Sequence, residues 1–275
     1  MEKKDLIISG FTGYRFENIL PYIKSIDRHC SSADLVMVVG QTDKGTITKL
    51  TDMGWKVELV PNVSEIPIHV LRFLPMYEYL YNNYKNYRYV VSTDVKDVIF
   101  QSDPFIWLQD NLGTKKLVAG SEALKYCDEP WGNDNLRSTY GDYVFDRFAQ
   151  NPIYNVGTLG GHAEYMKDLF FSLFYNSIGR PIPIVDQAVF NIMIQTLPYK
   201  DSVLFAEQSK GWACQAGTVA DPAKMAYFRP NLLEAEPVWR DGKVYTNQGK
   251  LFTIVHQYDR VPEWRNIILE EYTKT

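Results

Sequence analysis

The first hundred residues alternate between short apolar runs and longer segments whose apolar side chains recur at helical spacing. The apolar runs predict buried strands, and the longer segments predict helices packed against them. The predicted strands are Asp5–Ser9, Asp34–Gly40, Trp55–Val60 and Tyr87–Thr93, and the predicted helices are Phe16–Cys30, Asp43–Met53 and Pro67–Tyr84. Strands that alternate with helices pair in parallel, because each helix returns the chain to the same end of the sheet. The sequence therefore predicts an α/β fold with a mostly parallel central sheet flanked by helices.

Beyond Pro104 the alternation becomes less regular. A polar and aromatic stretch from Tyr126 to Tyr143 predicts no clear element. The remaining segments predict strands at Lys116–Gly120 and Leu251–His256 and helices at Ala163–Tyr175 and Asp186–Thr196. No linker-like stretch and no internal repeat interrupts the chain, so we expect one domain spanning residues 1–275.

Composition excludes several classes of function. The formal net charge is −4 and the Lys and Arg residues are scattered, so the sequence offers no basic surface for duplex nucleic acid. Cys30, Cys127 and Cys214 are an odd number without metal-binding spacing, which predicts reduced thiols rather than disulfides or a zinc site. The apolar run before Gly10 is too short for a signal peptide or membrane anchor. These features predict a cytoplasmic protein with no membrane span.

The most informative segment is VVSTDVKDVIFQSDP, residues 90–104. Asp94 follows a predicted buried strand directly, and ligands of open α/β sheets bind at the carboxyl ends of strands. On an extended chain Asp94 and Lys96 would share one face while Asp97 pointed away. Asp97 can therefore join Asp94 in one site only if the chain turns after Asp94.

This segment resembles the acidic metal-site segment of GT-A glycosyltransferases, in a variant written D-x-[K/R]-D-x-x-F-Q-x-D-P. The resemblance implies a GT-A type, Rossmann-like fold and a nucleotide-sugar donor whose departing diphosphate is neutralised by a divalent cation, Mn²⁺ or Mg²⁺. The usual form is D-x-D, whereas Lys96 occupies the third position here, where it is expected to touch phosphate. We predict that Asp94 and Asp97 bind the metal and that Asp94 also contacts the donor. Alternatively, the two acids cap an element and Asp97 pairs with Lys96.

His256 follows the last predicted strand, and a histidine near the C-terminus completes the metal shell in many metal-dependent members of this superfamily. The resemblance thus implies His256 as a third ligand, and imidazole suits Mn²⁺ better than Mg²⁺. The alternative is a structural histidine on an apolar strand.

Two more segments resemble the same transferases. Asn155-Val-Gly157 matches an N-[A/S/V]-G segment that lies beside the donor sugar, where Asn155 would bind a hydroxyl and Gly157 would allow close approach. Asp186-Gln187 matches a D-Q pair that opens a helix near the reacting sugar, and we predict both as catalytic residues, with Asp186 as general base or hydrogen-bond partner of the donor. The alternatives are a strand-to-helix turn for the first segment and a helix N-cap for Asp186.

The resemblance also implies contacts to the nucleotide and to the acceptor. Thr12 and Tyr14 follow the first strand, where this fold places the nucleobase, so Tyr14 would stack on uracil. Arg72 matches a basic position near the diphosphate, with a solvated helix residue as the alternative. The segment Tyr126–Gly132 combines acids with a tryptophan, which suits an acceptor sugar or, alternatively, an exposed turn.

Taken in order, these segments cover most of the chain. The set is most similar to glycosyltransferases of large DNA viruses of algae, which include a xylosyltransferase, and implies action in the host cytoplasm. We expect a nucleotide-binding half at residues 1–104, an acceptor-binding half at residues 105–275, and transfer of a sugar, with xylose as one candidate, from a UDP donor to a glycan hydroxyl. Inverting and retaining chemistry both stay open. Two alternatives also remain: a glycoside hydrolase, which needs two carboxylates but neither nucleotide nor metal, and a nucleotide-sugar-binding module without catalysis.

Overall fold

The structure is a computed structural model that describes residues 3–60 and 65–273. A seven-stranded sheet has the order β3-β2-β1-β4-β7-β6-β8. Its strands are β1 (Lys4–Phe11), β2 (Asp34–Val39), β3 (Lys56–Leu59), β4 (Tyr87–Thr93), β6 (Leu117–Lys125), β7 (Pro152–His162) and β8 (Val203–Ala206). Every neighbouring pair is parallel except the two that involve β7, which is antiparallel to β4 and β6. The predicted mostly parallel sheet is confirmed.

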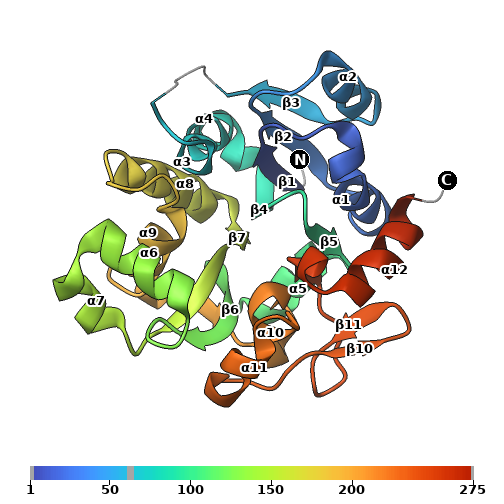
Figure 1. Ribbon diagram of the computed structural model, residues 1–275. Coiled ribbons are helices and arrows are strands. Elements are labelled where there is room, and N and C mark those ends of the chain that lie inside the picture. Colours follow the sequence, from blue (N-terminus) through green and yellow to red (C-terminus); the bar gives the residue numbers. More distant parts are fainter. Residues whose placement is uncertain (1–2, 61–64, 274–275) are drawn as a thin grey trace.

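Helices cover both faces of this sheet, as Figure 1 shows for α1 on one side of β1 and β4 and for α4 and α8 on the other. The helices that pack on the sheet are α1 (Phe16–His29), α2 (Lys44–Asp52), α3 (Ile68–Leu71), α4 (Phe73–Asn83), α5 (Pro104–Asn111), α8 (Ala163–Ser177) and α9 (Asp186–Ile194). Alternate residues of β1 face opposite cores: Ile7 packs in the core with α1, and Leu6 and Ile8 pack in the core with α4 and α8. The sequence of β1 is accordingly apolar on both faces.

A second, three-stranded sheet joins distant parts of the chain. Its order is β5-β12-β9, with β5 (Val98–Phe100), β9 (Ala213–Gln215) and β12 (Ile254–His256). The central strand β12 runs antiparallel to β5, so that His256 pairs with Val98, and parallel to β9, so that His256 pairs with Gln215. This register brings His256 beside the residue that follows Asp97.

The remaining elements surround these two sheets. They are the helices α6 (Pro130–Tyr140), α7 (Asp142–Phe148), α10 (Ala216–Val219), α11 (Met225–Phe228) and α12 (Pro262–Thr273), the hairpin of β10 (Val238–Arg240) and β11 (Lys243–Tyr245), and the 3-10 turns Tyr84–Asn86, Lys200–Ser202, Gln208–Lys210, Arg229–Asn231 and Tyr258–Arg260. No helix in the described part of the chain has the length and apolar character needed to cross a membrane.

Most differences from the prediction are local. The helix predicted at Pro67–Tyr84 is divided at Arg72, and the strand predicted at Leu251–His256 is regular only over its last three residues. The stretch from Tyr126 to Tyr143, for which no element was predicted, forms α6 and the start of α7. Glu129 caps α6 by accepting a hydrogen bond from the backbone N–H of Gly132, and Pro130 occupies the first turn, where its missing N–H is not needed.

Candidate active site

The chain turns immediately after β4, as the joint use of Asp94 and Asp97 requires. β4 ends at Thr93, and Val95–Asp97 form a turn before β5 begins at Val98. The backbone N–H of Asp94 donates to the carbonyl oxygen of Gly157 at 3.0 Å, which ties the turn to β7. Both carboxylates face His256: its Nε2 lies 3.5 Å from Asp94 Oδ2 and 3.8 Å from Asp97 Oδ1. Asp97 therefore faces the histidine in this structure.

His256 is buried, and a hydrogen bond on the side away from the carboxylates fixes its ring. Its Nδ1 lies 2.8 Å from Gln215 Oε1, and Gln215 Nε2 donates to Thr158 Oγ1 at 2.8 Å. Because an amide oxygen can only accept, Nδ1 carries the hydrogen and Nε2 is left to face the carboxylates. Burial lowers the pKa of His256, but hydrogen bonding to Asp94 and the charges of Asp97 and Asp94 outweigh burial and raise it. A proton or a metal cation can thus occupy the position between Nε2 and the carboxylates.

Arg72 connects this group to the second half of the chain. It lies at the junction of α3 and α4, is 8% exposed, and is not a solvated helix residue. Its Nη1 donates to Asp94 Oδ1 at 2.6 Å and its Nη2 to Asp186 Oδ2 at 3.1 Å. Burial raises the pKa of Asp94, but Arg72 and His256 outweigh burial and lower it. Asp94 is thus held as a carboxylate by two cationic or hydrogen-bonding neighbours.

A second cluster surrounds a buried carboxylate that the sequence did not indicate, Glu122 on β6. Asn155 Nδ2 and Gln187 Nε2 both donate to Glu122 Oε1, at 2.7 and 2.6 Å. The amide oxygens are also engaged, since Asn155 Oδ1 accepts from the N–H of Gly157 and Gln187 Oε1 accepts from the N–H of Val156. The Asn155 and Gln187 amides are therefore fixed in orientation by hydrogen bonds at both ends.

Gly157 allows the two clusters to approach each other. It lies inside β7 rather than in a strand-to-helix turn. A Cβ at this position would lie 2.7 Å from Asp94 Oδ2, 2.9 Å from Asn155 Oδ1 and 2.9 Å from His256 Cε1. Lack of space, and not an unusual backbone angle, therefore explains glycine here.

If Asp94, Asp97 and His256 bind Mn²⁺, Gly157→Ala should weaken that binding at least about tenfold, because displacing Asp94 and His256 costs on the order of 1–3 kcal/mol. Gly160→Ala is the matched control: its Cβ would lie 2.9 Å from the ring of Trp212, away from the carboxylates. The control is expected to lower the free energy of unfolding while leaving Mn²⁺ affinity unchanged. Calorimetric titration with Mn²⁺ and urea unfolding of both variants check this, and equal Mn²⁺ affinities of Gly157→Ala and wild type would contradict it.

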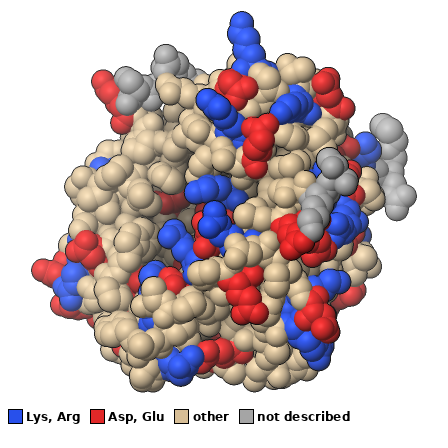
Figure 2. All heavy atoms as spheres, turned by 45° about the vertical axis from the view of Figure 1, so that its right-hand side comes forward, with Lys and Arg blue, Asp and Glu red and all other residues tan. Residues whose placement is uncertain are grey.

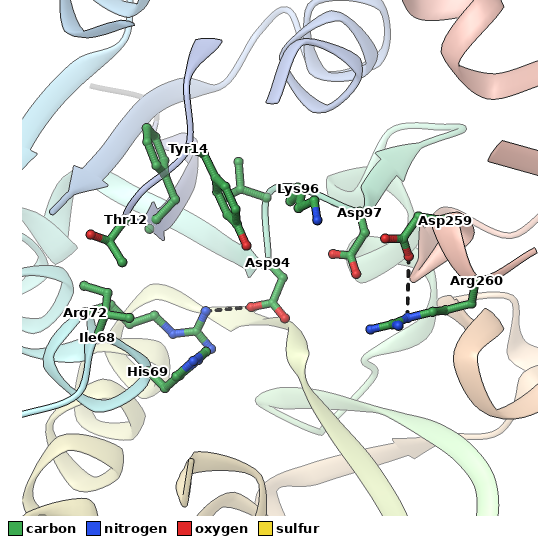
Figure 3. A pocket seen from close by; sticks show the side chains of 13 residues that line it. Thr12, Tyr14, Ile68, His69, Arg72, Asp94, Lys96, Asp97, Asp259 and Arg260 are labelled. Carbon is green, nitrogen blue, oxygen red and sulfur yellow. Dashed lines mark hydrogen bonds and ion pairs between the residues drawn. The ribbon is translucent and has the colours of Figure 1, made fainter. Parts of the chain in front are cut away.

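The predicted site residues line two adjoining cavities. The first, of about 290 Å³, contains Thr12, Tyr14 and Lys96 (Figure 3). The second, of about 390 Å³, is lined from the predicted set by Asn155, Gly157, Asp186, Gln187 and His256. Arg72, Asp94 and Asp97 line both, and on the face shown in Figure 2 acidic and basic side chains surround a central hollow. The structure thus brings every predicted site residue to one continuous depression.

The first cavity combines one aromatic face with hydrogen-bonding groups. Lys96 Nζ lies 5.8 Å from the centre of the Tyr14 ring, and Thr12 Oγ1 accepts the backbone N–H of Gln41 at 2.9 Å. Burial and the charges of Asp97 and Asp94 raise the pKa of Tyr14. Asp259 and Arg260 complete the wall opposite Arg72 (Figure 3). An aromatic ring beside cations suits a nucleobase next to a phosphate.

The oxygen and nitrogen atoms of Asp94, Asp97 and His256 are of the kinds that bind a divalent cation, although the three side chains are not arranged around a common point as they would be in a formed metal site. In the described part of the chain, no group of three or more His, Cys, Asp or Glu side chains is arranged as a metal site. Asp94, Asp97 and His256 nevertheless offer carboxylate oxygens and an imidazole nitrogen on one side of the cavity, a set that Mn²⁺ accepts.

Several lining residues were not predicted. They are Glu122, Lys224, Asp259, Arg260 and His69, and Gln215, which holds His256 from outside the cavities, was not predicted either. None of these residues lies in a motif that the sequence pattern singled out. Trp131, inside the predicted acceptor segment, is 50% exposed and lines the second cavity.

The fold is that of GT-A-like glycosyltransferases. The chain matches the apo structure of WbbM, described as a bifunctional glycosyltransferase, with a TM-score of 0.55 and 12% identity, over 100% of this chain and 52% of that chain. It matches the glycosyltransferase GlyE of Streptococcus pneumoniae TIGR4 with a TM-score of 0.56 and 16% identity, over 98% of this chain and 64% of that chain. The chain thus spans between half and two thirds of the length of these proteins. No protein-family model and no curated protein sequence matches it.

Proposed function

We propose that this protein is a metal-dependent glycosyltransferase that moves a sugar from a UDP-sugar donor to a hydroxyl group of a carbohydrate acceptor. The observation that carries the proposal is the meeting of Asp94, Asp97 and His256 at the boundary between the two cavities. These residues come from the end of β4, the following turn and the end of β12. Such a cluster is expected where a diphosphate must be bound between a nucleoside and a sugar.

In the proposed complex, the first cavity binds the uridine and the second binds the donor sugar. Tyr14 stacks on uracil, and Thr12 lies at the edge of the base. Arg72 and Lys96 contact the diphosphate, because guanidinium and ammonium groups bind phosphate oxygens. A Mn²⁺ or Mg²⁺ ion bound by Asp94, Asp97 and His256 would add positive charge where the diphosphate leaves. Residues 1–104 then form most of the nucleotide-binding half.

The donor sugar lies against Asn155 and Gly157 in this proposal, and UDP-xylose is one candidate donor. Asp186 and Gln187 lie at the start of α9 beside it. The acceptor enters past Trp131, whose exposed ring can pack against the C–H groups of a sugar.

The experiment that tests the proposal is a thermal-stability measurement with UDP- and GDP-sugars, each with and without Mn²⁺. A ligand at about 100 times its Kd stabilises the native state by about 2.7 kcal/mol, which corresponds to a rise in Tm of about 5 °C for a chain of this size. We expect this rise with one or more UDP-sugars, and only when Mn²⁺ is present.

Other results would favour the alternatives. No shift with any nucleotide sugar, together with metal-independent release of sugar from a glycoside, would favour a hydrolase. Binding of a UDP-sugar without either transfer or slow donor hydrolysis would favour a binding module without catalysis.

A further inference from the structure

We propose that Glu122 is the catalytic base, whose carboxylate takes the proton of the acceptor hydroxyl as that oxygen bonds to the anomeric carbon of the donor. This inference rests on the proposed function and adds to it a residue that the sequence did not indicate. It follows from the hydrogen bonds of the acids that line the second cavity.

Four of the five acids that line this cavity are engaged elsewhere. Asp94 and Asp97 face His256, at the position proposed for the metal. Asp186 has both oxygens occupied, because Oδ2 accepts from Arg72 and Oδ1 accepts from the backbone N–H of Gln187 at 3.1 Å. Glu129 uses Oε2 to cap α6.

Glu122 differs from these acids in accepting two side-chain hydrogen bonds at a single oxygen while its other oxygen stays free. Oε1 accepts both amide hydrogen bonds, whereas Oε2 has no hydrogen-bond partner among the described residues and is not sealed from solvent. The side chain is only 7% exposed, and the residue lines the cavity. Glu122 Oε2 is therefore accessible from the cavity, where a bound ligand could reach it.

The backbone around Glu122 is distorted in a way that orients it. Strand β6 shifts register against β7 before this residue, between Ala119 and Gly120, and again across it, between Ser121 and Lys125. The next residue, Ala123, adopts a φ of +57°, which is unfavourable for a residue with a Cβ. Such strain persists where the surrounding structure requires one orientation, and it is concentrated at functional sites.

The neighbours of Glu122 fix where it acts. Asn155 and Gln187, both hydrogen-bonded to its carboxylate, are the residues expected beside the donor sugar. Burial raises the pKa of Glu122, although the hydrogen bond from Asn155 acts against burial. A carboxylate with a raised pKa is a stronger base than one in water. The position of Glu122 beside the expected donor sugar and its raised pKa are both those expected of a catalytic base.

The step balances without another reactant. The acceptor oxygen forms a bond to the anomeric carbon, and the bond from that carbon to the β-phosphate oxygen breaks. The bonding electron pair leaves with UDP. The acceptor proton moves to Glu122 Oε2 and is later released to water.

The test measures UDP release from UDP-glucose and UDP-xylose in the presence of Mn²⁺, with water as the acceptor. Glu122→Gln retains an oxygen that can accept from both amides, so the variant is expected to fold and to keep the donor-dependent rise in Tm. Its rate of UDP release is expected to fall by about 10²-fold or more, the usual loss when a general base is removed. Glu122→Asp retains a carboxylate and is expected to have an intermediate rate.

Glu234→Gln is the matched control. Glu234 is also a partly buried carboxylate with a raised pKa, caused mainly by burial, and it accepts from Ser121, next to Glu122, but lies outside both cavities. Its substitution is expected to leave the rate unchanged. Glu129→Gln tests the other acid with an oxygen free of protein partners among the described residues.

Several other outcomes would contradict the assignment of Glu122 as the base or the function on which it rests. A rate for Glu122→Gln within about fivefold of wild type, or a large loss for Glu129→Gln alone, would show that Glu122 is not the base. Loss of the donor-dependent Tm shift in Glu122→Gln would show a role in binding instead. A wild-type protein that binds a donor without releasing UDP would also refute Glu122 as base. A wild-type protein that binds no UDP-sugar would refute the proposed function itself.

Discussion

Replacing Asp97 with alanine is expected to abolish the Mn²⁺-dependent stabilisation by a UDP-sugar without destabilising the unliganded protein. If Kd rises 100-fold, a ligand that stabilised wild type by about 2.7 kcal/mol contributes only about 0.4 kcal/mol at the same concentration. The Tm shift of about 5 °C then falls to about 1 °C. Thermal unfolding with and without Mn²⁺ and donor measures both quantities.

The stability of the unliganded variant follows from the direction of the pKa shift. Burial and the charges of Asp94 and Asp259 raise the pKa of Asp97, although His256 opposes them. A carboxyl group whose pKa is raised on folding lowers stability when it is ionised, above the unfolded-state pKa of about 4. At pH 7, removing the Asp97 carboxylate therefore removes an electrostatic cost of folding and does not lower the free energy of unfolding. Any stability that Asp97→Ala gains over wild type in this way disappears at lower pH, where Asp97 of the wild type is protonated.

Asp52, exposed at the end of α2, supplies the control. Asp52→Ala is expected to keep the full Tm shift with Mn²⁺ and donor. A shift of wild-type size in Asp97→Ala would refute the assignment of Asp97 as a metal ligand.

Replacing Arg72 with alanine is expected to give the largest loss of stability among these substitutions, about 3–5 kcal/mol at pH 7. The guanidinium is the shared partner of Asp94 and Asp186, and Asp186 is only 3% exposed. Its removal leaves these carboxylates close together without their counter-charge. Urea unfolding at pH 7 measures the loss. Arg72→Lys is expected to recover part of it, because an ammonium group cannot make the two-pronged contact.

The loss is expected to depend on pH. Arg72 helps to lower the pKa of Asp94, so its contribution is present above the unfolded-state pKa and is lost as the pH falls through the folded-state pKa. The difference in free energy of unfolding between wild type and Arg72→Ala should therefore shrink as the pH is lowered below about 4, the unfolded-state pKa of an aspartate.

An exposed pair gives the comparison. Arg229 contacts Glu236 through Nε and Nη2, with 62% of its side chain exposed. Arg229→Ala is expected to change the free energy of unfolding much less than Arg72→Ala, because water screens an exposed ion pair. If Arg72→Ala cost no more than Arg229→Ala, the view of Arg72 as the necessary counter-charge of this site would be wrong.

The parts of the fold that the sequence predicted best are those with a strong local signal. Tyr87–Thr93 is bounded in the structure as expected, since a run rich in aromatic and β-branched residues ends at Asp94. The direction of β7 was not predicted, because the pattern of side chains along a strand is the same whichever way the strand runs. Helix α7 was missed because Gly141, with φ of +81°, separates two short helices whose aromatic and polar residues have no clear period.

In the candidate site, too, the residues that could be predicted are those with a local signal or a family resemblance. Asp94 could be placed from its position after a strand, and His256 from its family resemblance. The turn that brings in Asp97 was stated only as a condition, because the two residues between Asp94 and Asp97 do not determine a turn. Glu122 depends on a register shift against β7, and Gln215 on pairing with a strand far along the chain. Such pairings arise from tertiary packing and leave no local pattern.

The pairing of β12 between β5 and β9 also sets an order of events during synthesis. Asp94 and Asp97 leave the ribosome long before His256, and β5 has no partner in this sheet until β12 has been made. At about 5–20 residues per second, the interval of 162 residues between Asp94 and His256 lasts on the order of ten seconds. During that interval the growing polypeptide carries both carboxylates without their histidine, so the proposed site would be complete only when the last strand is inserted.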